Sequence, residues 1–283
     1  MSDRWAAWLA ERRFGGSDEA RAESEHLFTG FRARVLEGAR VAPGETVLDV
    51  GCGEGLIGFG ALDLVGDDGR VIFSDISEDV LSVCRAIADG DARCEFVRAS
   101  ADELPLADAS VDVVTTRSVL IYLEDKEAAL REFFRVLRPG GKLSMFEPIN
   151  SFGYPEPEGV FAGFDVQPVW DVAEKVRDCY GATASPLLGW DERDLLRWTE
   201  EAGFADVEVT LEIEVKPHRM MQSRDWNAFR NVAPNPLAPT LQEEMDEKLT
   251  SDEQQRLVAH LRPLVERGEG SYRMASAYVR AVH

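Results

Sequence analysis

The sequence predicts an α/β fold in which a mostly parallel sheet carries helices on both of its faces. Three observations support this prediction. Strand-like and helix-like segments alternate from residue 45 to residue 215, which is typical of β-α-β units. A glycine-rich turn, Gly51-Cys52-Gly53-Glu54-Gly55, directly follows the first buried strand pattern. The chain has 283 residues, 45% of them hydrophobic, enough for one large core with attached elements.

The expected elements follow one another in order along this region. Strands are predicted near residues 46–50, 70–74, 94–98, 111–116 and 142–147, and helices near 56–64, 78–88, 126–137 and 191–202. The last of these helices begins with acidic residues and ends before Gly203, a normal start and stop. The alternating segment Val207–Val215 predicts a half-buried edge strand. Residues 271–279, the last strand of the chain, are its expected partner.

Three segments fall outside this alternation. We expect residues 1–43 to form an N-terminal helical lid. Residues 150–190 form an insertion that is rich in Gly, Pro and aromatic residues, and residues 217–269 are expected to form a cap between the last two strands. Hairpin loops are usually ~2–5 residues long, so the third segment must have structure of its own. Leu241–Leu249 and Gln254–Leu264 are predicted to be helical within it, despite Pro263. The sheet domain then consists of residues 44–216 and 270–283.

Charge and cysteine content disfavour several classes of protein. The net charge of -21 disfavours a nucleic-acid partner, whose affinity would depend on neutralising phosphates. No segment approaches the ~18 uninterrupted apolar residues of a membrane span, and the N-terminus lacks a signal-peptide pattern. The four cysteines, Cys52, Cys84, Cys94 and Cys179, show neither close pairing nor metal-ligand spacing. We therefore expect a soluble cytoplasmic protein without a metal, as a monomer or homodimer.

The motif with the most chemical content is Val47-Leu48-Asp49-Val50-Gly51-Cys52-Gly53-Glu54-Gly55. An apolar run that ends at an acidic residue predicts a central parallel strand, and the glycines lack the Cβ atoms that would keep a nucleoside-containing cofactor at a distance. Residues 53–58 also satisfy the dinucleotide fingerprint, which normally serves a pyrophosphate at a helix N-terminus. Asp49 would repel that pyrophosphate, so a cationic cofactor fits better. An NAD(P)-dependent oxidoreductase remains the alternative.

Two further motifs point to a family. Ala101-Asp102-Glu103-Leu104-Pro105-Leu106 leads to the strand Val111–Val114, and Leu137-Arg138-Pro139-Gly140-Gly141-Lys142-Leu143 opens another strand after a helix. With the opening motif, they resemble the class I S-adenosylmethionine (SAM)-dependent methyltransferases, nearest the small-molecule, quinone-biosynthesis-like group, over residues 44–147. The resemblance implies a Rossmann-like sheet of seven strands with an antiparallel last strand. It also implies SAM as cofactor, S-adenosylhomocysteine (SAH) as product and a small-molecule acceptor.

Ligands of open α/β sheets bind beyond the carboxyl ends of the strands, so the cofactor site is expected there. By the resemblance, Asp49 and the glycines line the methionine and ribose, while Asp75, at the end of the second strand, accepts from the ribose hydroxyls. Ile76 lies on the adenine, and Asp102 accepts from its amino group. The full predicted cofactor set is Asp49, Gly51, Cys52, Gly53, Asp75, Ile76, Ala101, Asp102, Thr116, Arg117 and Phe14.

Four residues are candidates for the chemical step. A general base is needed only if the acceptor must lose a proton, and Glu147 and His26 are the candidates for that role; the alternatives are an ion pair for Glu147 and a surface helix position for His26. Tyr122 is expected either beside the substrate or in the core. Arg117 stands where many relatives have a small polar residue. It is a candidate to clamp the cofactor carboxylate, to orient an anionic or carbonyl-bearing substrate, or to pair with Glu147.

Aromatic residues are numerous in the three segments outside the sheet, including Trp5, Trp8, Phe152, Phe161 and Trp226. Most are expected to be ordinary packing residues. Because these segments are free to cover the strand ends, they favour a planar or hydrophobic acceptor such as a quinone, a phenol or an indole, methylated at O, N or C. A binding protein or cyclase that keeps the scaffold without transferring methyl is the second alternative.

Overall fold

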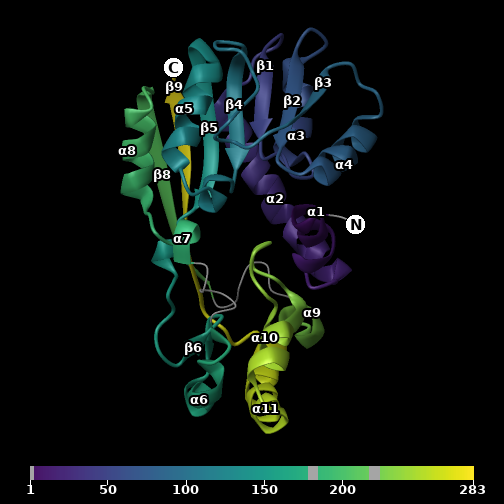
Figure 1. The fold of residues 1–283 in the computed structure, drawn as a ribbon, viewed down its shortest axis with the longest axis vertical. Helices are drawn as coiled ribbons and strands as arrows, with labels where there is room; N and C mark the ends of the chain where they lie inside the picture. The colour runs from purple at the N-terminus through teal and green to yellow at the C-terminus, as the bar shows by residue number, and fades with distance from the viewer. Residues whose placement is uncertain (1–2, 178–183, 217–223) are drawn as a thin grey trace. The chain divides into compact units, whose positions relative to one another are not determined.

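The computed structural model describes residues 3–177, 184–216 and 224–283. These residues form two compact units (Figure 1). We call Phe28–Ile149, Trp190–Glu212 and Ser276–His283 the sheet unit, and Met1–Leu27, Asn150–Gly189 and Ile213–Ala275 the helical unit. Cys179, one of the four cysteines whose spacing disfavours a disulfide framework or a metal site, lies outside the described residues.

A seven-stranded sheet in the order β3-β2-β1-β4-β5-β9-β8 is the basis of the sheet unit. The first five of these strands pair in parallel, and β9 pairs antiparallel with β5. The predicted mostly parallel sheet with an antiparallel last strand is therefore confirmed. The strands are β1 (Thr46–Val50), β2 (Arg70–Asp75), β3 (Cys94–Arg98), β4 (Val111–Arg117), β5 (Leu137–Pro148), β8 (Ala205–Lys216) and β9 (Tyr272–Val282).

β5 begins earlier than the sequence predicts. The expected start was residue 142, but Leu137 already pairs with Val111 of β4, and the register shifts between Val111 and Val113. The segment 138–141 therefore forms an irregularity inside the strand rather than a loop before it. Gly140, with φ +80°, supplies the left-handed turn that this irregularity needs.

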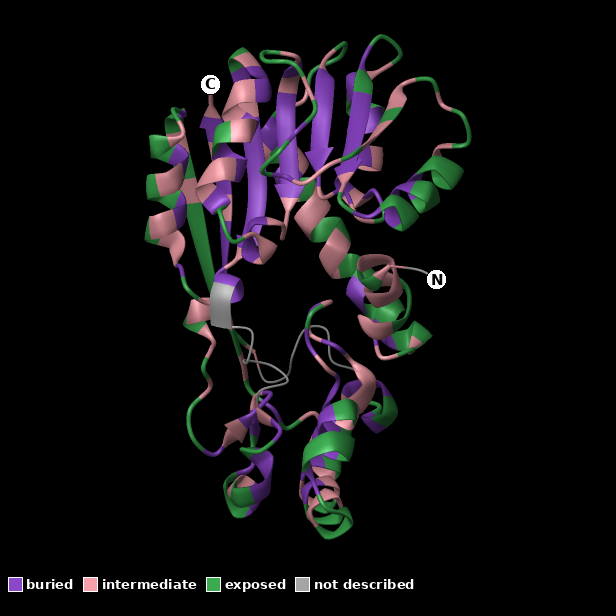
Figure 2. Cartoon of the chain, in the orientation of Figure 1, coloured by how far each residue is buried: buried purple, intermediate pink, exposed green. Residues whose placement is uncertain are grey.

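Helices cover both faces of the sheet, as predicted. Val47, Val71 and Val113 occupy one face and pack against α3 (Leu56–Val65) and α4 (Glu78–Ala88). Because side chains alternate along a strand, the neighbouring positions, such as Leu48 and Val114, project to the other face. α5 (Lys126–Val136) and α8 (Glu192–Glu201) form the second helical layer. The central strands are buried along most of their length (Figure 2).

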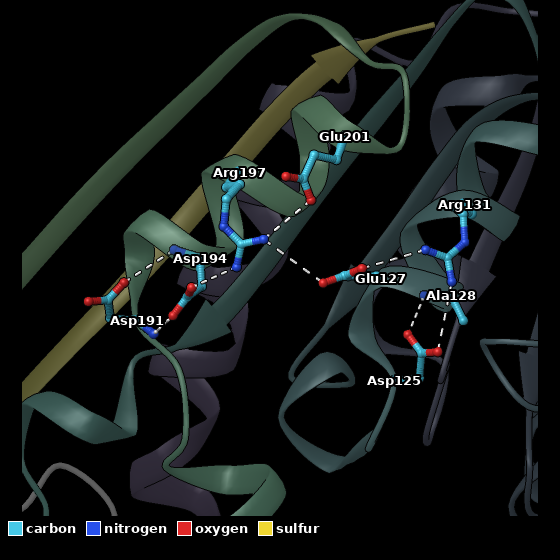
Figure 3. A network of polar contacts seen from close by, with 8 residues as sticks. All are labelled: Asp125, Glu127, Ala128, Arg131, Asp191, Asp194, Arg197 and Glu201. Carbon is cyan, nitrogen blue, oxygen red and sulfur yellow. Dashed lines mark hydrogen bonds and ion pairs between the residues drawn. The ribbon is translucent and has the colours of Figure 1, made fainter.

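Polar contacts join α5 and α8 at the surface of the sheet unit (Figure 3). Asp191 caps α8 by accepting from the Arg193 and Asp194 backbone N–H groups. Arg197 pairs with Asp194 at 2.9 Å and reaches Glu127 of α5 at 4.0 Å. Exposed ion pairs of this kind contribute only ~0–1 kcal/mol each. The network therefore fixes the orientation of the two helices more than it stabilises the fold.

The helical unit has a core of its own. Its buried members come from both the insertion and the final excursion, and include Phe161, Phe164, Phe229, Leu257 and Leu261. The predicted helices of the excursion are present, and Pro263 lies inside the longer one. The elements are α1 (Arg4–Ala7), a π-helical turn (Trp8–Arg12), the start of α2 (Asp18–Ala39), β6 (Val160–Phe161), β7 (Phe164–Asp165), α6 (Trp170–Ala173), α7 (Ala184–Leu187), α9 (Trp226–Asn231), α10 (Leu241–Lys248) and α11 (Ser251–Arg267).

The N-terminal segment is docked on the excursion within the helical unit. Trp8 Nε1 donates to the Ala233 carbonyl at 2.9 Å, and the Ala233 N–H donates to the Arg12 carbonyl at 2.9 Å. At Gly15, a Cβ would lie 2.2 Å from the Ala228 carbonyl oxygen, and φ is +58°. Gly15 therefore allows the close approach that joins the N-terminal segment to α9.

The compact units differ from the predicted domain boundaries at two places. Residues 28–43 belong to the sheet unit rather than to a separate lid, because α2 is one continuous helix whose later turns pack on the sheet. There Phe31 contacts Phe146 at 4.5 Å between ring centroids, and Ser144 Oγ donates to the Val35 carbonyl at 2.7 Å. Residues 150–189 group with the excursion rather than with the sheet, since their apolar side chains share its core.

Among the described residues, no helix has the length and apolar character needed to span a membrane. Within the same ranges, no three His, Cys, Asp or Glu side chains gather in a way that could hold a metal ion.

Candidate functional site

Asp49 organises the start of the glycine-rich loop. Its side chain is 1% exposed, and its carboxylate accepts from the Gly58 N–H at 2.8 Å and from Thr115 Oγ1 at 3.0 Å. Gly58 lies in the first turn of α3, where backbone N–H groups have no partner within the helix, so Asp49 accepts from one of these N–H groups. Burial raises the pKa of Asp49 to about 7, and the two hydrogen bonds oppose that shift. A nearby cation would favour its ionised form.

Asp75 connects the end of β2 to the same loop. Its Oδ2 accepts from the Gly53 N–H at 3.0 Å, and its Oδ1 accepts from the Ser77 N–H at 2.9 Å. These contacts hold the carboxylate at the carboxyl edge of the sheet, next to the glycines. A carboxylate has about four lone-pair sites, so these two backbone donors do not by themselves use up the acceptor capacity of Asp75.

The glycines of the loop serve different purposes. A Cβ on Gly51 would lie 2.2 Å from Val119 Cγ2, and φ is +62°. Gly51 is therefore required by the packing of the protein itself. Gly53 has φ +53°, and its carbonyl accepts from the buried Cys84 thiol at 3.1 Å. The Gly53 peptide is thus fixed on both sides, by Asp75 at its N–H and by Cys84 at its oxygen.

Cys52, the remaining loop residue of the predicted set, is buried. Its pKa is raised well above the usual range, first by a hydrogen bond with Cys84 and then by burial. Its backbone N–H donates to the Ser74 carbonyl at 2.9 Å, which joins the loop to β2. A buried, protonated thiol is a poor nucleophile, so Cys52 is suited to packing beneath the loop.

Beyond Asp75, the predicted adenine contacts follow β2 and β3. Ile76 is 50% exposed, an unusual state for a large aliphatic side chain directly after a buried strand. Ala101 is buried. Asp102 is exposed, and the Ser100 hydroxyl donates to its Oδ1. An apolar surface at Ile76 and an acceptor at Asp102 are the features that a purine ring with an amino group requires.

Glu147 anchors the loop that follows β4. Its side chain is fully buried, and its Oε1 accepts from the N–H groups of Val119 at 2.8 Å and Leu120 at 3.0 Å. Its Oε2 accepts from the Ile121 N–H at 3.3 Å. Burial raises the pKa of Glu147 to about 7, against the effect of these three bonds. The geometry favours an anchoring role for Glu147 over proton transfer, because its oxygens already hold the start of the 3-10 turn Leu120–Tyr122.

Arg117 and Tyr122 lie at the two ends of this anchored loop. The Arg117 guanidinium carbon lies 5.5 Å from the centroid of the Phe28 ring. Its pKa is lowered by burial, while neighbouring Tyr122 and Glu147 act in the opposite direction. Thr116 projects to the opposite face from Thr115, and its buried hydroxyl has no hydrogen-bond partner among the described residues. The predicted pairing of Arg117 with Glu147 is not present as an ion pair within those residues.

Phe14 and His26 belong to the helical unit, unlike the other predicted residues. Phe14 is 5% exposed, and the guanidinium groups of Arg13 and Arg21 lie 5.5 and 5.3 Å from its ring centroid. This environment favours a packing role for Phe14. His26 is exposed on α2, as the surface alternative expects. Their roles toward the cofactor and the acceptor stay predictions.

Several residues that shape the site were not singled out by the sequence. Thr115 and Gly58 hold Asp49, Ser77 holds Asp75, and Phe28 lies against Arg117. Ser77 carried a local signal, since a serine before an acidic first turn is a common helix N-cap. The contact between Phe28 and Arg117 joins residues far apart in the chain, and nothing local in the sequence indicates it.

Comparison with known proteins decides the family. A model of the methyltransferase domain matches residues 48–145. The demethylmenaquinone methyltransferase of Clavibacter sepedonicus is 33% identical over 223 residues, which cover 72% of this chain and 84% of that protein. The chain belongs to the class I SAM-dependent methyltransferases. The arsenite methyltransferase of Halobacterium salinarum is 33% identical over 206 residues, 72% of this chain and 47% of that protein.

Solved structures agree on the fold. The YcgJ protein from Bacillus subtilis superposes with a TM-score of 0.55 at 16% identity, covering 91% of this chain and 98% of that one. Family membership confirms the predicted enzyme class and its cofactor, SAM. The chain spans about half the length of the arsenite methyltransferase and of the quinone-biosynthesis C-methyltransferases that it also matches.

Proposed function

We propose that this chain transfers the methyl group of SAM to a small, aromatic or hydrophobic acceptor. The observation that carries the proposal is the arrangement at the carboxyl ends of β1, β2 and β4. There, Asp75 offers a ribose acceptor, Ile76 an exposed apolar surface and Asp49 a buried carboxylate beside the glycines. Methyl transfer from a sulfonium is an in-line displacement, so the chain has mainly to align the two reactants and exclude water.

A nicotinamide cofactor fits this arrangement less well. The dinucleotide fingerprint needs the N-terminus of the following helix for its pyrophosphate. In this chain, the Gly58 N–H of α3 is already taken by Asp49, and that carboxylate would repel a second anion. The sulfonium of SAM carries a positive charge, which an ionised Asp49 would instead attract. The contact between Asp49 and Gly58 therefore supports SAM over NAD(P).

An organic acceptor fits better than arsenite. Two relatives are named for arsenite and for demethylmenaquinone. Trivalent arsenic is a soft centre that prefers thiolate ligands. Cys52 and Cys84 are buried at the Gly53 carbonyl, and the pKa of Cys52 is raised, so neither offers an accessible thiolate. These cysteines support a carbon, oxygen or nitrogen acceptor of the quinone or phenol type.

The helical unit is proposed to cover the acceptor, with the protein in the reducing environment of the cytoplasm. Support for a cover comes from its apolar content, since the insertion and the excursion share one buried core. Support for the compartment comes from the three described cysteines, which are free. Deletion of residues 1–16 should abolish methyl transfer and retain measurable SAH binding; full activity after the deletion would mean that the N-terminal segment is no part of the cover.

Release of SAH in the presence of acceptors tests the proposed function. The full chain is incubated with SAM and with phenols, hydroquinones or indoles, and SAH and the methylated product are followed by mass spectrometry. We expect SAH and product in equal amounts with at least one acceptor. Acceptor turnover without SAH release would favour a cyclase-type reaction instead. Tight SAH binding with no turnover of any acceptor would favour a binding protein.

A further inference from the structure

Arg117 is held on a rigid loop. Directly after it, Ser118 adopts φ +57°, a left-handed conformation that is uncommon for a residue other than glycine. The Ser118 N–H donates to the Phe146 carbonyl at 2.8 Å, and Glu147 accepts from the next three N–H groups. Strained backbone that the surroundings fix in this way is common at ligand-binding positions. The loop therefore presents Arg117 in one defined place.

The guanidinium of Arg117 makes no ion pair with any residue that the structure describes. Within residues 3–177, 184–216 and 224–283, no hydrogen bond or ion pair joins it to another side chain or to the backbone; its neighbour is the Phe28 ring. Two carboxylates that act on it electrostatically make their hydrogen bonds elsewhere, Glu147 to the backbone of its loop and Asp49 to Gly58 and Thr115. Arg117 is half-buried and its guanidinium carries five N–H donors, so it can offer hydrogen bonds to a ligand.

Aromatic rings continue from Arg117 along the sheet, away from the predicted ribose site. Phe28 lies 6.4 Å from Phe31, Phe31 4.5 Å from Phe146, and Phe146 5.0 Å from Tyr278, measured between ring centroids. Arg117 pairs with Phe146 across β4 and β5, while Asp75 is on β2, on the other side of β1. The guanidinium therefore stands between the cofactor end of the site and an aromatic cluster that packs between α2 and the sheet.

We propose that Arg117 binds a carboxylate group of the methyl acceptor, so that the acceptor is an aromatic carboxylic acid. The inference rests on the proposed methyltransferase function and narrows its substrate class. A planar guanidinium matches a carboxylate with two parallel hydrogen bonds, and the flat Phe28 ring keeps it oriented. The chain has a net charge of -21, which disfavours anionic ligands in general. A local cation that forms no ion pair with the described residues offsets that field at one point and selects one kind of anion.

The carboxylate of SAM itself is the rival ligand, and the experiment separates the two sources. Calorimetry is performed on the full chain saturated with SAH, titrated with 4-hydroxybenzoate, 4-hydroxycinnamate or indole-3-acetate and with the corresponding carboxamides. The proteins are the parent, Arg117→Gln, Arg117→Lys and the control Arg131→Gln, which removes the same charge from an exposed position on α5. SAH affinity is measured separately for each protein.

We expect at least one acid to bind the parent about tenfold or more tightly than its amide, since one charge-assisted hydrogen bond is worth at least a decade. Arg117→Gln should abolish this preference, Arg117→Lys should retain part of it, and Arg131→Gln should keep all of it. SAH affinity should stay within about twofold in all four proteins. Without ligand, Arg117→Gln should melt no lower than the parent, because it removes a half-buried charge that makes no ion pair within the described residues.

Three results would overturn the assignment. One is the absence of any preference for acid over amide in the parent, and another is a preference that persists in Arg117→Gln. The third is a tenfold or larger loss of SAH affinity in Arg117→Gln, which would assign the guanidinium to the cofactor carboxylate. A failure of the proposed function would give a different result: the parent would still prefer the acid to the amide, but no acceptor would cause the release of SAH.

Discussion

Replacing Asp75 with alanine should weaken the binding of SAM and SAH by about tenfold to a hundredfold. In the structure, the carboxylate already accepts from the Gly53 and Ser77 N–H groups. We propose that the two ribose hydroxyls donate to the same carboxylate. A hydrogen bond to a charged group is worth ~1.5–3 kcal/mol. One such bond corresponds to one or two decades in affinity at ~1.4 kcal/mol per decade.

Two further variants separate the ribose contact from the support of the loop. Asp75→Asn keeps one acceptor oxygen for a backbone N–H group but loses the charge, so it should bind SAH with intermediate affinity. Asp79→Ala removes the same charge from an exposed position in the first turn of α4 and should bind like the parent. Circular dichroism and thermal melting of each protein check that the sheet unit remains folded.

Titration calorimetry with SAH is the assay for this series. We expect affinities in the order parent, Asp79→Ala, Asp75→Asn and Asp75→Ala, with the first two equal within error. Unchanged affinity in a folded Asp75→Ala protein would remove Asp75 from the ribose site. An equal loss of SAH affinity in Asp79→Ala would mean that the negative charge near the N-terminus of α4 matters, and not a specific contact of Asp75 with the ribose.

The remaining predictions concern the glycine loop and the two buried carboxylates. Gly51→Ala should lower the free energy of unfolding by about 1–3 kcal/mol, because the new Cβ would meet Val119. In the double variant, Val119→Ala should restore part of the lost stability. Denaturant titrations in which the two losses simply add would contradict this contact. Glu147→Gln should lower the melting temperature and leave SAH affinity unchanged, because an amide group takes the place of the carboxylate oxygen that accepts from the Ile121 N–H. A hundredfold loss of turnover at unchanged stability would indicate a general base instead. Asp49 has a folded pKa of about 7, above its unfolded value, so its contribution to stability is present at low pH and is lost as pH rises through about 7. The melting temperature of the parent should therefore fall more steeply between about pH 4 and pH 7 than that of Asp49→Asn, and parallel curves would contradict the raised pKa.

The sheet could be predicted from the sequence because its signals are local. Each parallel strand is a short apolar run, and β1 ends at Asp49 and a glycine turn that mark the carboxyl edge. The position of Asp75 followed from the same logic, since the ends of neighbouring parallel strands meet at one edge. The boundary between the units was harder to predict, because α2 runs through both and no residue within it interrupts the helical pattern.

The side-chain partners in the site could not be predicted, because they join segments that are distant in the chain. Glu147 was a candidate for either a base or an ion pair, and nothing in the sequence indicated the three backbone N–H groups from which it accepts. Gly51 was expected to make room for the cofactor, yet the nearest obstacle to a side chain there is Val119. Periodicity predicts which face a residue occupies and carries no information on which atoms it will meet there.

The most direct test of the cofactor site is a calorimetric titration of the unmodified chain with SAH, followed by the same titration with NADH. We predict one SAH bound per chain, in a site that excludes NADH, because Asp49 already occupies the helix N-terminus that a pyrophosphate would need. Binding of NADH with no heat from SAH would contradict the assignment of the glycine loop to SAM.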